Sequence, residues 1–552
     1  MTSSLQKGQD PDLEEISHAP VRRDAASNLF AGLDVSTQSC KLVVIDPAVG
    51  DVLLVETVNY DRDLPHYGTR DGVIPELGPG VAESDPRMWL EAVDSVLQRL
   101  ADSSVPQARI RGLSVSGQQH GLVALDAAGR LTRSRSKLWN DVSTHEECRW
   151  LTEQVGGPAA MLQEIGNRQR PGYTAGKILH LIRQEPAAFE QAATLFIVHN
   201  FINWYLTGGP EGGVRCLDPG EASGLGLWNP RTGDWSRRLI SAIHPDLAGK
   251  LPPLLPADAV IGTISPQLAH RFDLSTECLI AAGSGDNQLA ALGTGHTGPG
   301  RVTVSLGTSG TVCTVYETPP PADDGAIALY RDSTGRYLSL LCVSNLANGY
   351  NALRREYGLI HADFERLVAH TPPGNGGRLL IPWHDGERTP DLPLAVPVHF
   401  GFGLADFTPE ILCRAVLEGH VLNLYEGYRL MNLTPGEIRL TGGLARSAAW
   451  GQCIADVFAV DSIPVEGEGA ALGAALHAAW IWERNHHSGR ALSEIVDPFI
   501  IMDETRRCRP HPELAEIVEL QRRLFRAVSR RIRGESGEDP FRLGHELRSR
   551  ST

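Results

Sequence analysis

The chain has 552 residues, of which 42% are hydrophobic and 21% are charged. That length is too great for one ordinary core and predicts two large domains, while the composition excludes a collagen-like or broadly disordered protein. The formal net charge of −15 argues against a nucleic-acid partner, whose phosphates favour a basic surface. Nucleotide binding stays open, because phosphate loops use backbone N–H groups more than net charge.

The cysteines and the N-terminus indicate a cellular compartment. Nine cysteines are scattered singly, without the paired spacing of a zinc site, which is typical of reduced thiols. Residues 1–28 are polar and lack the basic start and apolar run of a secretory signal, so we expect a disordered N-terminal extension. No apolar stretch reaches the roughly 20 residues that a membrane helix needs. These features together predict a cytoplasmic protein.

The first half of the chain predicts strands that are separated by polar loops and one helix. Apolar and β-branched runs mark the strands, at 28–35, 41–46, 52–58 and 110–115. The helix opens at Ser84-Asp85-Pro86 and places apolar side chains on one face as far as Leu100. Polar loops follow two of the strands, at 36–39 and 116–121.

The second half repeats this order. Strands at 302–306 and 311–316 flank a Gly/Ser/Thr loop, an amphipathic helix is predicted at 409–430, and a strand follows at 437–441. One such unit in each half predicts two similar α/β domains that face each other across a cleft. After about residue 505 we expect a helix near 514–528 and then a mobile, Arg-rich tail.

Two hydroxyl-rich loops are candidates for binding phosphate. The first contains Ser36 and Thr37. The second contains Gly307 and Thr308, and each turn offers outward N–H groups. Asp34, beside the first loop, can hold Mg²⁺, and the metal can bridge to a phosphate. An ordinary hairpin explains either loop alone, whereas two of them, one in each half, can clamp a nucleotide at its phosphates from both sides.

A third glycine cluster lies between a strand and a helix. Gly442 and Gly443 let a ribose or a flat ring lie against the backbone, and Arg446 follows at the start of the helix. A plain strand-to-helix turn is the alternative. The small-residue run at 468–475 is explained equally well by close helix packing and by a ligand contact.

Two polar clusters suit the hydroxyl groups of a sugar. Gln119 and His120 follow a predicted strand, and a neutral histidine can donate or accept a hydrogen bond. Asp286 and Asn287 pair an acceptor with a group that does both. A structural histidine is the alternative for His120.

Phosphoryl transfer from ATP to a sugar alcohol also needs a base that accepts the hydroxyl proton. Asp218 stands out among the acids by its turn context, Asp-Pro-Gly-Glu. Glu221 is a nearby competitor, and composition alone does not choose between them.

Nine tracts, taken in order, resemble the FGGY carbohydrate kinases. They lie at 32–37, 118–121, 138–141, 166–174, 285–287, 305–310, 386–390, 442–447 and 468–473. Within that family, Gln118-Gln-His-Gly121 differs from the Asn-Gln-Arg-Glu tract of glycerol kinases. The tract at 64–69 is similar to that of members that phosphorylate xylulose.

The resemblance implies an α/β fold with two ribonuclease-H-like, actin-type ATPase domains and an active site in the cleft between them. It implies a sugar-binding N-terminal domain at 29–291, an ATP-binding C-terminal domain at 292–500, and a helix with an Arg-rich tail at 501–552. The implied reaction is the phosphorylation of D-xylulose to D-xylulose 5-phosphate, with ATP and Mg²⁺ as cofactors. The alternatives are another ketopentose or a polyol as substrate, or a non-catalytic sugar or nucleotide sensor. Expected partners are the sugar and ATP, without nucleic acid or membrane, and a homodimer is the candidate assembly.

By motif position, the resemblance also implies residue roles. Asp34 is the metal-linked acid and Asp218 the general base. The sugar contacts are Gln119, His120, Asp286 and Asn287, and the nucleotide contacts are Ser36, Thr37, Gly307, Thr308, Gly442, Gly443 and Arg446.

The tract after Asp218 departs from the family pattern, because Pro219, Gly220 and Glu221 follow it. A hydroxyl residue is usual two positions after the base. We therefore expect Gly220 to remove a hydrogen bond that orients the carboxylate.

Overall fold

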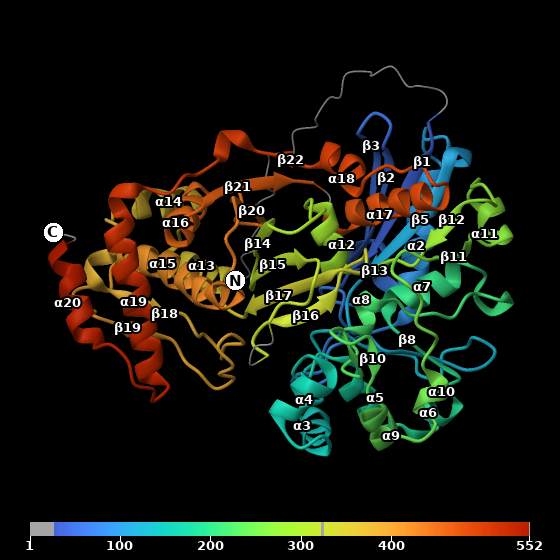
Figure 1. Ribbon diagram of the computed structural model, residues 1–552, viewed down its shortest axis with the longest axis horizontal. Coiled ribbons are helices and arrows are strands. Elements are labelled where there is room, and N and C mark those ends of the chain that lie inside the picture. Colours follow the sequence, from blue (N-terminus) through green and yellow to red (C-terminus); the bar gives the residue numbers. More distant parts are fainter. Residues whose placement is uncertain (1–26, 322–324, 468, 551–552) are drawn as a thin grey trace, which may run out of the picture.

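The computed structural model describes residues 27–321, 325–467 and 469–550. The expected N-terminal extension, 1–28, lies outside the described residues apart from Ser27 and Asn28. Two α/β lobes, each built on a seven-stranded sheet, make up the described chain (Figure 1). We call them the N-lobe, whose sheet strands lie between 29 and 285, and the C-lobe, whose sheet strands lie between 302 and 502.

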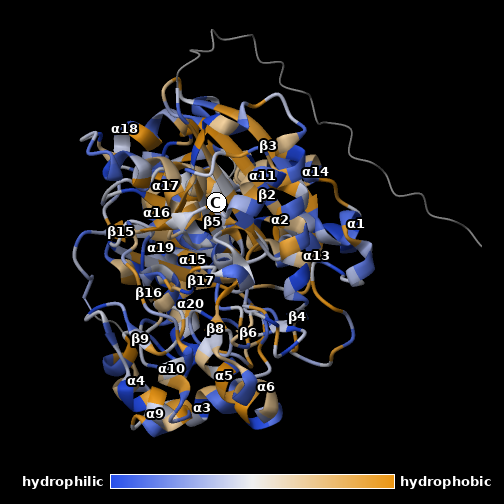
Figure 2. Cartoon of the chain, turned by 90° about the vertical axis from the view of Figure 1, so that its right-hand side faces the viewer, coloured by the Kyte–Doolittle hydropathy of each residue, from blue (hydrophilic) through white to orange (hydrophobic). Residues whose placement is uncertain are grey.

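The N-lobe sheet has the order β11-β12-β5-β1-β2-β3, with β13 paired to β5. Its strands are β1 (Leu29–Val35), β2 (Ser39–Asp46), β3 (Asp51–Asn59), β5 (Ile110–Gly117), β11 (Val260–Thr263), β12 (Leu279–Ala281) and β13 (Ser284–Gly285). β1, β2 and β3 form an antiparallel meander, whereas β1 pairs with β5 and β5 with β12 in parallel. Figure 2 shows the apolar colouring around β2 and β3, in keeping with the apolar runs that predicted these strands.

The C-lobe sheet repeats this order as β16-β17-β15-β14-β20-β21-β22. Its strands are β14 (Val302–Leu306), β15 (Gly310–Tyr316), β16 (Ala328–Arg331), β17 (Tyr337–Val343), β20 (Glu437–Thr441), β21 (Asp461–Glu466) and β22 (Ile501–Met502). β14 pairs with β15 antiparallel and with β20 in parallel, as β1 does with β2 and β5. The predicted repetition of one unit per half is confirmed.

Helices cover the sheets and fill the regions between them. In the first half they are α1 (Tyr60–Asp63), α2 (Pro86–Ala101), α3 (His145–Gln154), α4 (Pro158–Ile165), α5 (Thr174–Gln184), α6 (Pro186–Gln191), α7 (Val198–Leu206), α8 (Pro219–Ala222), α9 (Arg237–Ile243), α10 (Leu247–Lys250), α11 (Pro266–Arg271) and α12 (Asp286–Gly293). In the second half they are α13 (Ala347–Tyr357), α14 (His361–Ala369), α15 (Pro409–Tyr428), α16 (Ala448–Phe458), α17 (Gly469–Asn485), α18 (Leu492–Val496), α19 (Ala515–Ile532) and α20 (Pro540–Arg550). Four two-stranded sheets lie between these elements: β4 (Glu83–Ser84) with β7 (Ser136–Lys137), β6 (Val123–Leu125) with β8 (Thr194–Phe196), β9 (Trp228–Asn229) with β10 (Asp234–Trp235), and β18 (Leu379–Ile381) with β19 (Val398–Phe400).

Helix α17 follows the C-lobe strands in sequence but packs on the N-lobe sheet, beside β1, β2 and β5 (Figure 1). The approach is close, because a Cβ on Gly32 would lie 2.1 Å from the carbonyl oxygen of Ala471. A Cβ on Gly473 would lie 1.8 Å from the carbonyl oxygen of Leu289, on α12. The small-residue run at 468–475 therefore serves helix packing through its described residues, which was one of its two interpretations.

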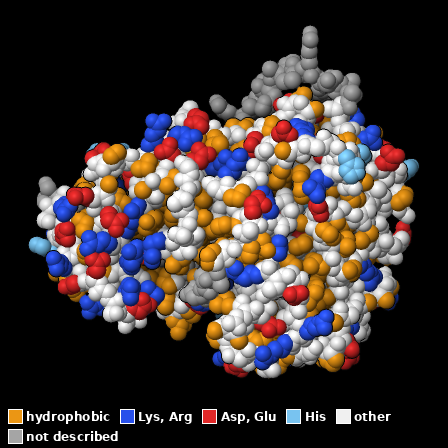
Figure 3. Space-filling model, viewed as in Figure 1, with side chains coloured by type: hydrophobic (Ala, Val, Ile, Leu, Met, Phe, Trp, Pro, Cys, Tyr) orange, Lys and Arg blue, Asp and Glu red, His pale blue; other side chains and the backbone are white. Residues whose placement is uncertain are grey.

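The C-terminal residues form two helices on the C-lobe. Helix α19 lies where a helix was predicted, but α20 occupies the region expected to be a mobile tail. Its Leu543 and Leu547 are buried against the lobe. Many arginines of this region pair with acids, as Arg526 does with Glu426 at 2.8 Å, and Figure 3 shows both signs of charge mixed over this face. The tail is thus ordered through residue 550 by apolar burial and ion pairs.

Candidate active site

The N-lobe brings polar groups together where its parallel strands end. Asp34 on β1 lies beside Ser116 on β5, which in turn pairs with Ser284 on β13. The Ser116 hydroxyl donates a hydrogen bond to Asp34 Oδ1 at 2.7 Å. Because carboxyl ends of parallel neighbours share one edge of the sheet, residues some 250 positions apart in the chain meet here.

Two carboxylates at this edge repel each other. Desolvation raises the pKa of Asp286 to about 7, and the charge of Asp34 adds to that increase. Desolvation also raises the pKa of Asp34, against the hydrogen bond from Ser116 and the charge of Lys41. A divalent cation would relieve this repulsion, and Mg²⁺ commonly uses one or two carboxylates together with water and phosphate oxygens. In the described part of the chain no group of three or more His, Cys, Asp or Glu forms a metal cluster. The residues present therefore fit a Mg²⁺ site that has only one or two protein ligands.

Asp218 is buried, accepts two hydrogen bonds and lies in close contact with His199. It is the N-cap of α8, where its Oδ2 accepts from the amide of Glu221 at 3.2 Å. Ser284 Oγ donates to the same oxygen at 2.9 Å, and His199 Nε2 lies 2.9 Å from Oδ1. Burial acts to raise the pKa of Asp218, but the charge and hydrogen bond of His199, with the other donors, bring it below its usual value. This carboxylate is kept ionised and fixed in direction.

The departure at Gly220 has a structural counterpart. A Cβ at Gly220 would lie 2.0 Å from Ser284 Oγ, so only glycine leaves room for that hydroxyl. Ser284 then supplies a hydrogen bond to the Asp218 carboxylate. Gly220 itself supplies no side-chain hydrogen bond, but the carboxylate still accepts from a hydroxyl, because Ser284 on another strand takes that place.

Glu221, the competing base, is also buried, but its pKa is shifted in the opposite direction from that of Asp218. Burial raises its pKa well above the usual value, and the nearby charges of Asp218 and Asp286 add to this effect. Its Oε2 accepts from the backbone amide of His120 at 3.2 Å. A neutral acid is a poor proton acceptor, so Asp218 is the better candidate of the two.

The predicted sugar contacts gather next to these acids. Gln119 Nε2 donates to Gln288, and Gln119 Oε1 accepts from Asn287 at 2.8 Å. Its amide is thus partly occupied in holding α12. By contrast, Gln118 Oε1 and His120 Nδ1 are buried without a hydrogen-bond partner in the structure. Burial lowers the pKa of His120 well below its usual value, and the charge of Lys177 lowers it further, so the ring is neutral.

The first hydroxyl loop connects β1 to β2 beside this cluster. Ser36 bonds back across the turn to the carbonyl oxygen of Ser39 through both its amide and its hydroxyl. The indole of Trp139 donates to Thr37 Oγ1 at 2.9 Å, and a Cβ on Gly72 would collide with the Thr37 carbonyl oxygen. The loop is therefore held on two sides.

The C-lobe places its glycine loops side by side, because β14 and β20 are parallel neighbours. The carbonyl oxygens of Gly307 and Thr308 accept from Ala347 and Leu346, both at 3.1 Å, which ties this loop to the start of α13. Gly442 has a φ of +88°, which favours glycine.

The remaining groups of this second cluster are open to solvent. Thr308, Gly442, Gly443 and Arg446 are all exposed, and Arg446 pairs with Glu466 at 2.9 Å. A Cβ on Gly443 would meet nothing within 4 Å. The predicted site residues therefore form two groups, a largely enclosed one on the N-lobe and an open one on the C-lobe.

The lobes also touch directly. The side chain of Asn167 bonds to both backbone groups of Leu329 on β16, at 2.8 and 2.9 Å. Ser223 Oγ accepts from the amide of Arg331 at 2.9 Å. Strand β16 thus joins the C-lobe sheet to the N-lobe close to Asp218.

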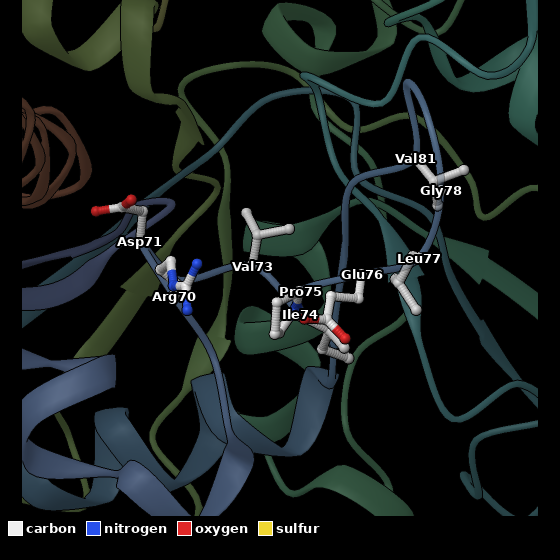
Figure 4. Close-up of a pocket in the computed structure, with 9 residues that line it drawn as sticks. All are labelled: Arg70, Asp71, Val73, Ile74, Pro75, Glu76, Leu77, Gly78 and Val81. Carbon is white, nitrogen blue, oxygen red and sulfur yellow. The ribbon is translucent and has the colours of Figure 1, made fainter.

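A recess of about 420 Å³ lies outside this site, along segment 70–81. Figure 4 shows its lining, with Arg70 and Asp71 toward one end and Val81 toward the other. None of the predicted site residues lines it. Its relation to the site is indirect, through the contact of Gly72 with the first loop.

Two site residues were missed from the sequence. His199 lies on α7 within an apolar run and matches no motif. Ser284 lies on β13, two positions before Asp286 and outside the tracts that the sequence singles out. Because both act through contacts between distant segments, no local spacing signals them.

Comparison with known proteins finds two family matches. The N-terminal domain of the FGGY family of carbohydrate kinases matches residues 29–293, and the C-terminal domain of the same family matches residues 302–482. The xylulose kinase of Haemophilus influenzae is 31% identical over 508 residues, covering 89% of this chain and 97% of that protein. The xylulose kinase of Streptomyces rubiginosus is 34% identical over 460 residues, covering 82% and 88%.

Solved structures share the fold. The crystal structure of xylulose kinase from Bifidobacterium adolescentis has a TM-score of 0.75 at 27% identity, covering 89% of this chain and 98% of that one. The predicted fold, two ribonuclease-H-like domains of the actin type, is confirmed.

Proposed function

The chain belongs to the FGGY family of carbohydrate kinases, and on this premise we propose that it phosphorylates D-xylulose to D-xylulose 5-phosphate with ATP and Mg²⁺. Membership makes it an ATP-using sugar kinase. The names of its relatives support the substrate. The observation that carries the proposal is the buried Asp218 carboxylate, which accepts hydrogen bonds from Ser284 and from the Glu221 amide and lies in one polar cluster with His120, Asp286 and Asp34.

Sugar binding follows from the polar groups that lack partners. Leaving Gln118 Oε1 and His120 Nδ1 buried and unpaired costs free energy, which a ligand hydroxyl can recover. Asn287 and Asp286 lie at the start of α12 and are partly accessible. We assign to these groups, with Gln119, the hydroxyls of the sugar.

Proton removal is assigned to Asp218. Its two oxygens are oriented by Ser284 and His199, so an alcohol bound against the carboxylate meets a fixed acceptor. The lowered pKa keeps the group deprotonated when the sugar arrives. As the phosphoryl group is transferred, the alcohol proton passes to Asp218.

We assign the binding of the ATP phosphates, and the neutralisation of their charge, to groups on both lobes. Asp34 would hold Mg²⁺, with the nearby charge of Asp286 adding to the attraction, and the metal when bound neutralises charge on phosphoryl oxygens. Backbone N–H groups near Ser36 and Thr37 on one lobe, and Gly307 and Thr308 on the other, would hold the phosphate chain. Gly442, Gly443 and Arg446 would contact the nucleoside.

The substrate is tested by measuring ADP release for ketopentoses, ketohexoses, polyols and glycerol. We expect the highest kcat/KM for D-xylulose. Equal values for ribulose or glycerol would contradict the substrate and favour the second candidate, a kinase for another ketopentose or polyol. Sugar binding without turnover of any acceptor would instead favour the non-catalytic sensor.

The proposal also covers the cellular compartment and the oligomeric state. In the described part of the chain no helix is long and apolar enough to cross a membrane. All nine cysteines are unpaired, which supports a reducing compartment, and we propose the cytoplasm. We also propose a homodimer, supported by exposed apolar side chains such as Leu394, Leu404 and Phe541. Fractionation and sedimentation equilibrium test these two statements.

A further inference from the structure

Tyr330 belongs to the C-lobe, yet its side chain lies against His120, one of the predicted sugar contacts of the N-lobe. It sits on β16, the edge strand of the C-lobe sheet, and is only 4% exposed. Its hydroxyl is 3.1 Å from that of Tyr173, which precedes α5 of the N-lobe. Its ring stacks on His120 with 6.3 Å between centroids and 27° between planes. Tyr173 lies closer to the same imidazole, at 4.8 Å.

The position of Tyr330 is set by the backbone on both sides of it. Asn167 holds both backbone groups of Leu329, and Ser223 holds the amide of Arg331. These bonds do not involve the Tyr330 side chain. A truncated side chain would therefore leave β16 docked on the N-lobe, and the space it vacates would open toward His120.

The His120 ring is also confined by the chain at Gly224. A Cβ on Gly224 would lie 2.1 Å from its Cε1, so the chain passes directly against the imidazole. The backbone amide of His120 bonds to Glu221, three residues from Asp218. The acids mark the end of the sugar that receives the phosphoryl group, and the two tyrosines mark the boundary beyond His120.

We propose that Tyr330, supported by Tyr173, forms the wall that limits the acceptor to a five-carbon ketose. The inference rests on the proposed function and extends it to substrate size. A fixed aromatic ring packs against the C–H groups of a sugar that fits and overlaps the extra hydroxymethyl group of one that is longer. Burial, with Tyr173, raises the pKa of Tyr330 well above its usual value, so the wall is uncharged.

The test compares six-carbon with five-carbon 2-ketoses in wild type, Tyr330→Ala and Tyr330→Phe. We expect Tyr330→Ala to raise the ratio of kcat/KM for D-fructose or D-tagatose to that for D-xylulose by about 10- to 100-fold, the usual range for one methylene. Tyr330→Phe keeps the ring and should change the ratio less than about 3-fold. The matched control is Tyr337→Ala on the neighbouring strand β17, where the ring packs under Arg331 instead.

An unchanged ratio in Tyr330→Ala, with a melting temperature close to wild type, would overturn the proposal. If Tyr330→Ala does not fold, Tyr330→Leu, which keeps apolar volume but not the reach of the ring, replaces it with the same expected direction. Ratios are measured against D-ribulose as well as D-xylulose. If the wild-type enzyme prefers D-ribulose, the proposed substrate is wrong, but the ratio of six-carbon to five-carbon ketoses can still be measured. Failure of the proposed substrate is therefore distinguishable from failure of the proposed role of Tyr330.

Discussion

The two lobes share a strand order but carry different residues at the ends of their strands. At the ends of β1, β5 and β13 the N-lobe carries a carboxylate and two serines, Asp34, Ser116 and Ser284, and Asp218 is 1% exposed nearby. At the ends of β14 and β20 the C-lobe carries glycines and threonine that are open to solvent. One scaffold thus supports two kinds of site, because the side chains after the strands, not the strands, decide the chemistry.

In the proposed function, proton and metal chemistry belong to the N-lobe and nucleotide binding to the C-lobe. The N-lobe groups are preorganised by hydrogen bonds among themselves, as in the contacts of Asp218 with Ser284 and His199. In the C-lobe, Gly307 and Thr308 are held through their backbone carbonyl oxygens, and Arg446 pairs with Glu466 at the surface. We therefore expect substitutions on the two lobes to separate turnover from ATP affinity.

The largest expected effect is on turnover, from Asp218→Asn. Loss of the proton acceptor should lower kcat by about 10²- to 10⁴-fold while the KM for ATP changes little. Steady-state ADP release measures both. Glu221→Gln is the comparison, because burial raises the pKa of Glu221 well above its usual value and the amide of glutamine is nearly isosteric with its carboxyl group. A loss from Glu221→Gln as large as that from Asp218→Asn would reverse the assignment of the base.

A large effect on stability is expected at the junction between the lobes. In Gly473→Ala the new methyl would overlap the carbonyl of Leu289 on α12, and we expect a loss of about 1–3 kcal/mol in the free energy of unfolding. Urea unfolding measures it. Gly249→Ala in α10 is the control, since nothing lies within 4 Å of its Cβ and alanine favours a helix. Equal stability of the two variants would argue against close packing of α17.

A smaller, selective effect is expected in the C-lobe. Gly443→Ala meets no protein atom within 4 Å, but its methyl would enter the space assigned to the nucleoside. The KM for ATP should rise about 10-fold, with the melting temperature unchanged, because close approach of backbone to ligand is lost. Gly298→Ala, equally unobstructed, provides the control. An unchanged KM would place the nucleoside elsewhere.

The smallest expected effect is a pH dependence that arises at Asp286. Its pKa is raised to about 7 in the folded protein, so the stability that its protonated form contributes is full below the unfolded pKa near 4 and is lost as pH rises toward 7. Relative to wild type, Asp286→Asn should gain about 2–4 °C in melting temperature between pH 5 and pH 8 without metal. The exposed Asp234→Asn should show no such trend. A constant difference across this range would contradict the coupling to Asp34.

Much of the fold could be predicted from local pattern. Apolar runs with hydroxyl loops located β1, β2, β14 and β15 within a few residues. Helix α20 was missed because only Leu543 and Leu547 mark its buried face, which is too weak a periodicity beside its arginines. The place of α17 on the other lobe was also unpredictable, since it depends on which sheet face is left uncovered.

The site was predictable only in part, for a related reason. Motif positions singled out Asp34, Asp218 and Asp286, but no spacing in the chain reports that Asp34 repels Asp286 or that His199 reaches Asp218. Ser284 and Gly220 illustrate the limit best, because a hydroxyl missing at one position is replaced by another 64 residues later. Such compensation is a property of tertiary contacts.

The crossing of α17 has a consequence for how this chain is made. During translation, β1, β2 and β5 are synthesised several hundred residues before α17. The apolar sheet face around Phe30 and Val43 therefore stays exposed until α17 has been made. A fragment ending near residue 293 would carry that bare face permanently and should self-associate. The final quarter of the polypeptide thus completes the domain that was begun first, and until then the exposed apolar surface favours aggregation of the nascent chain.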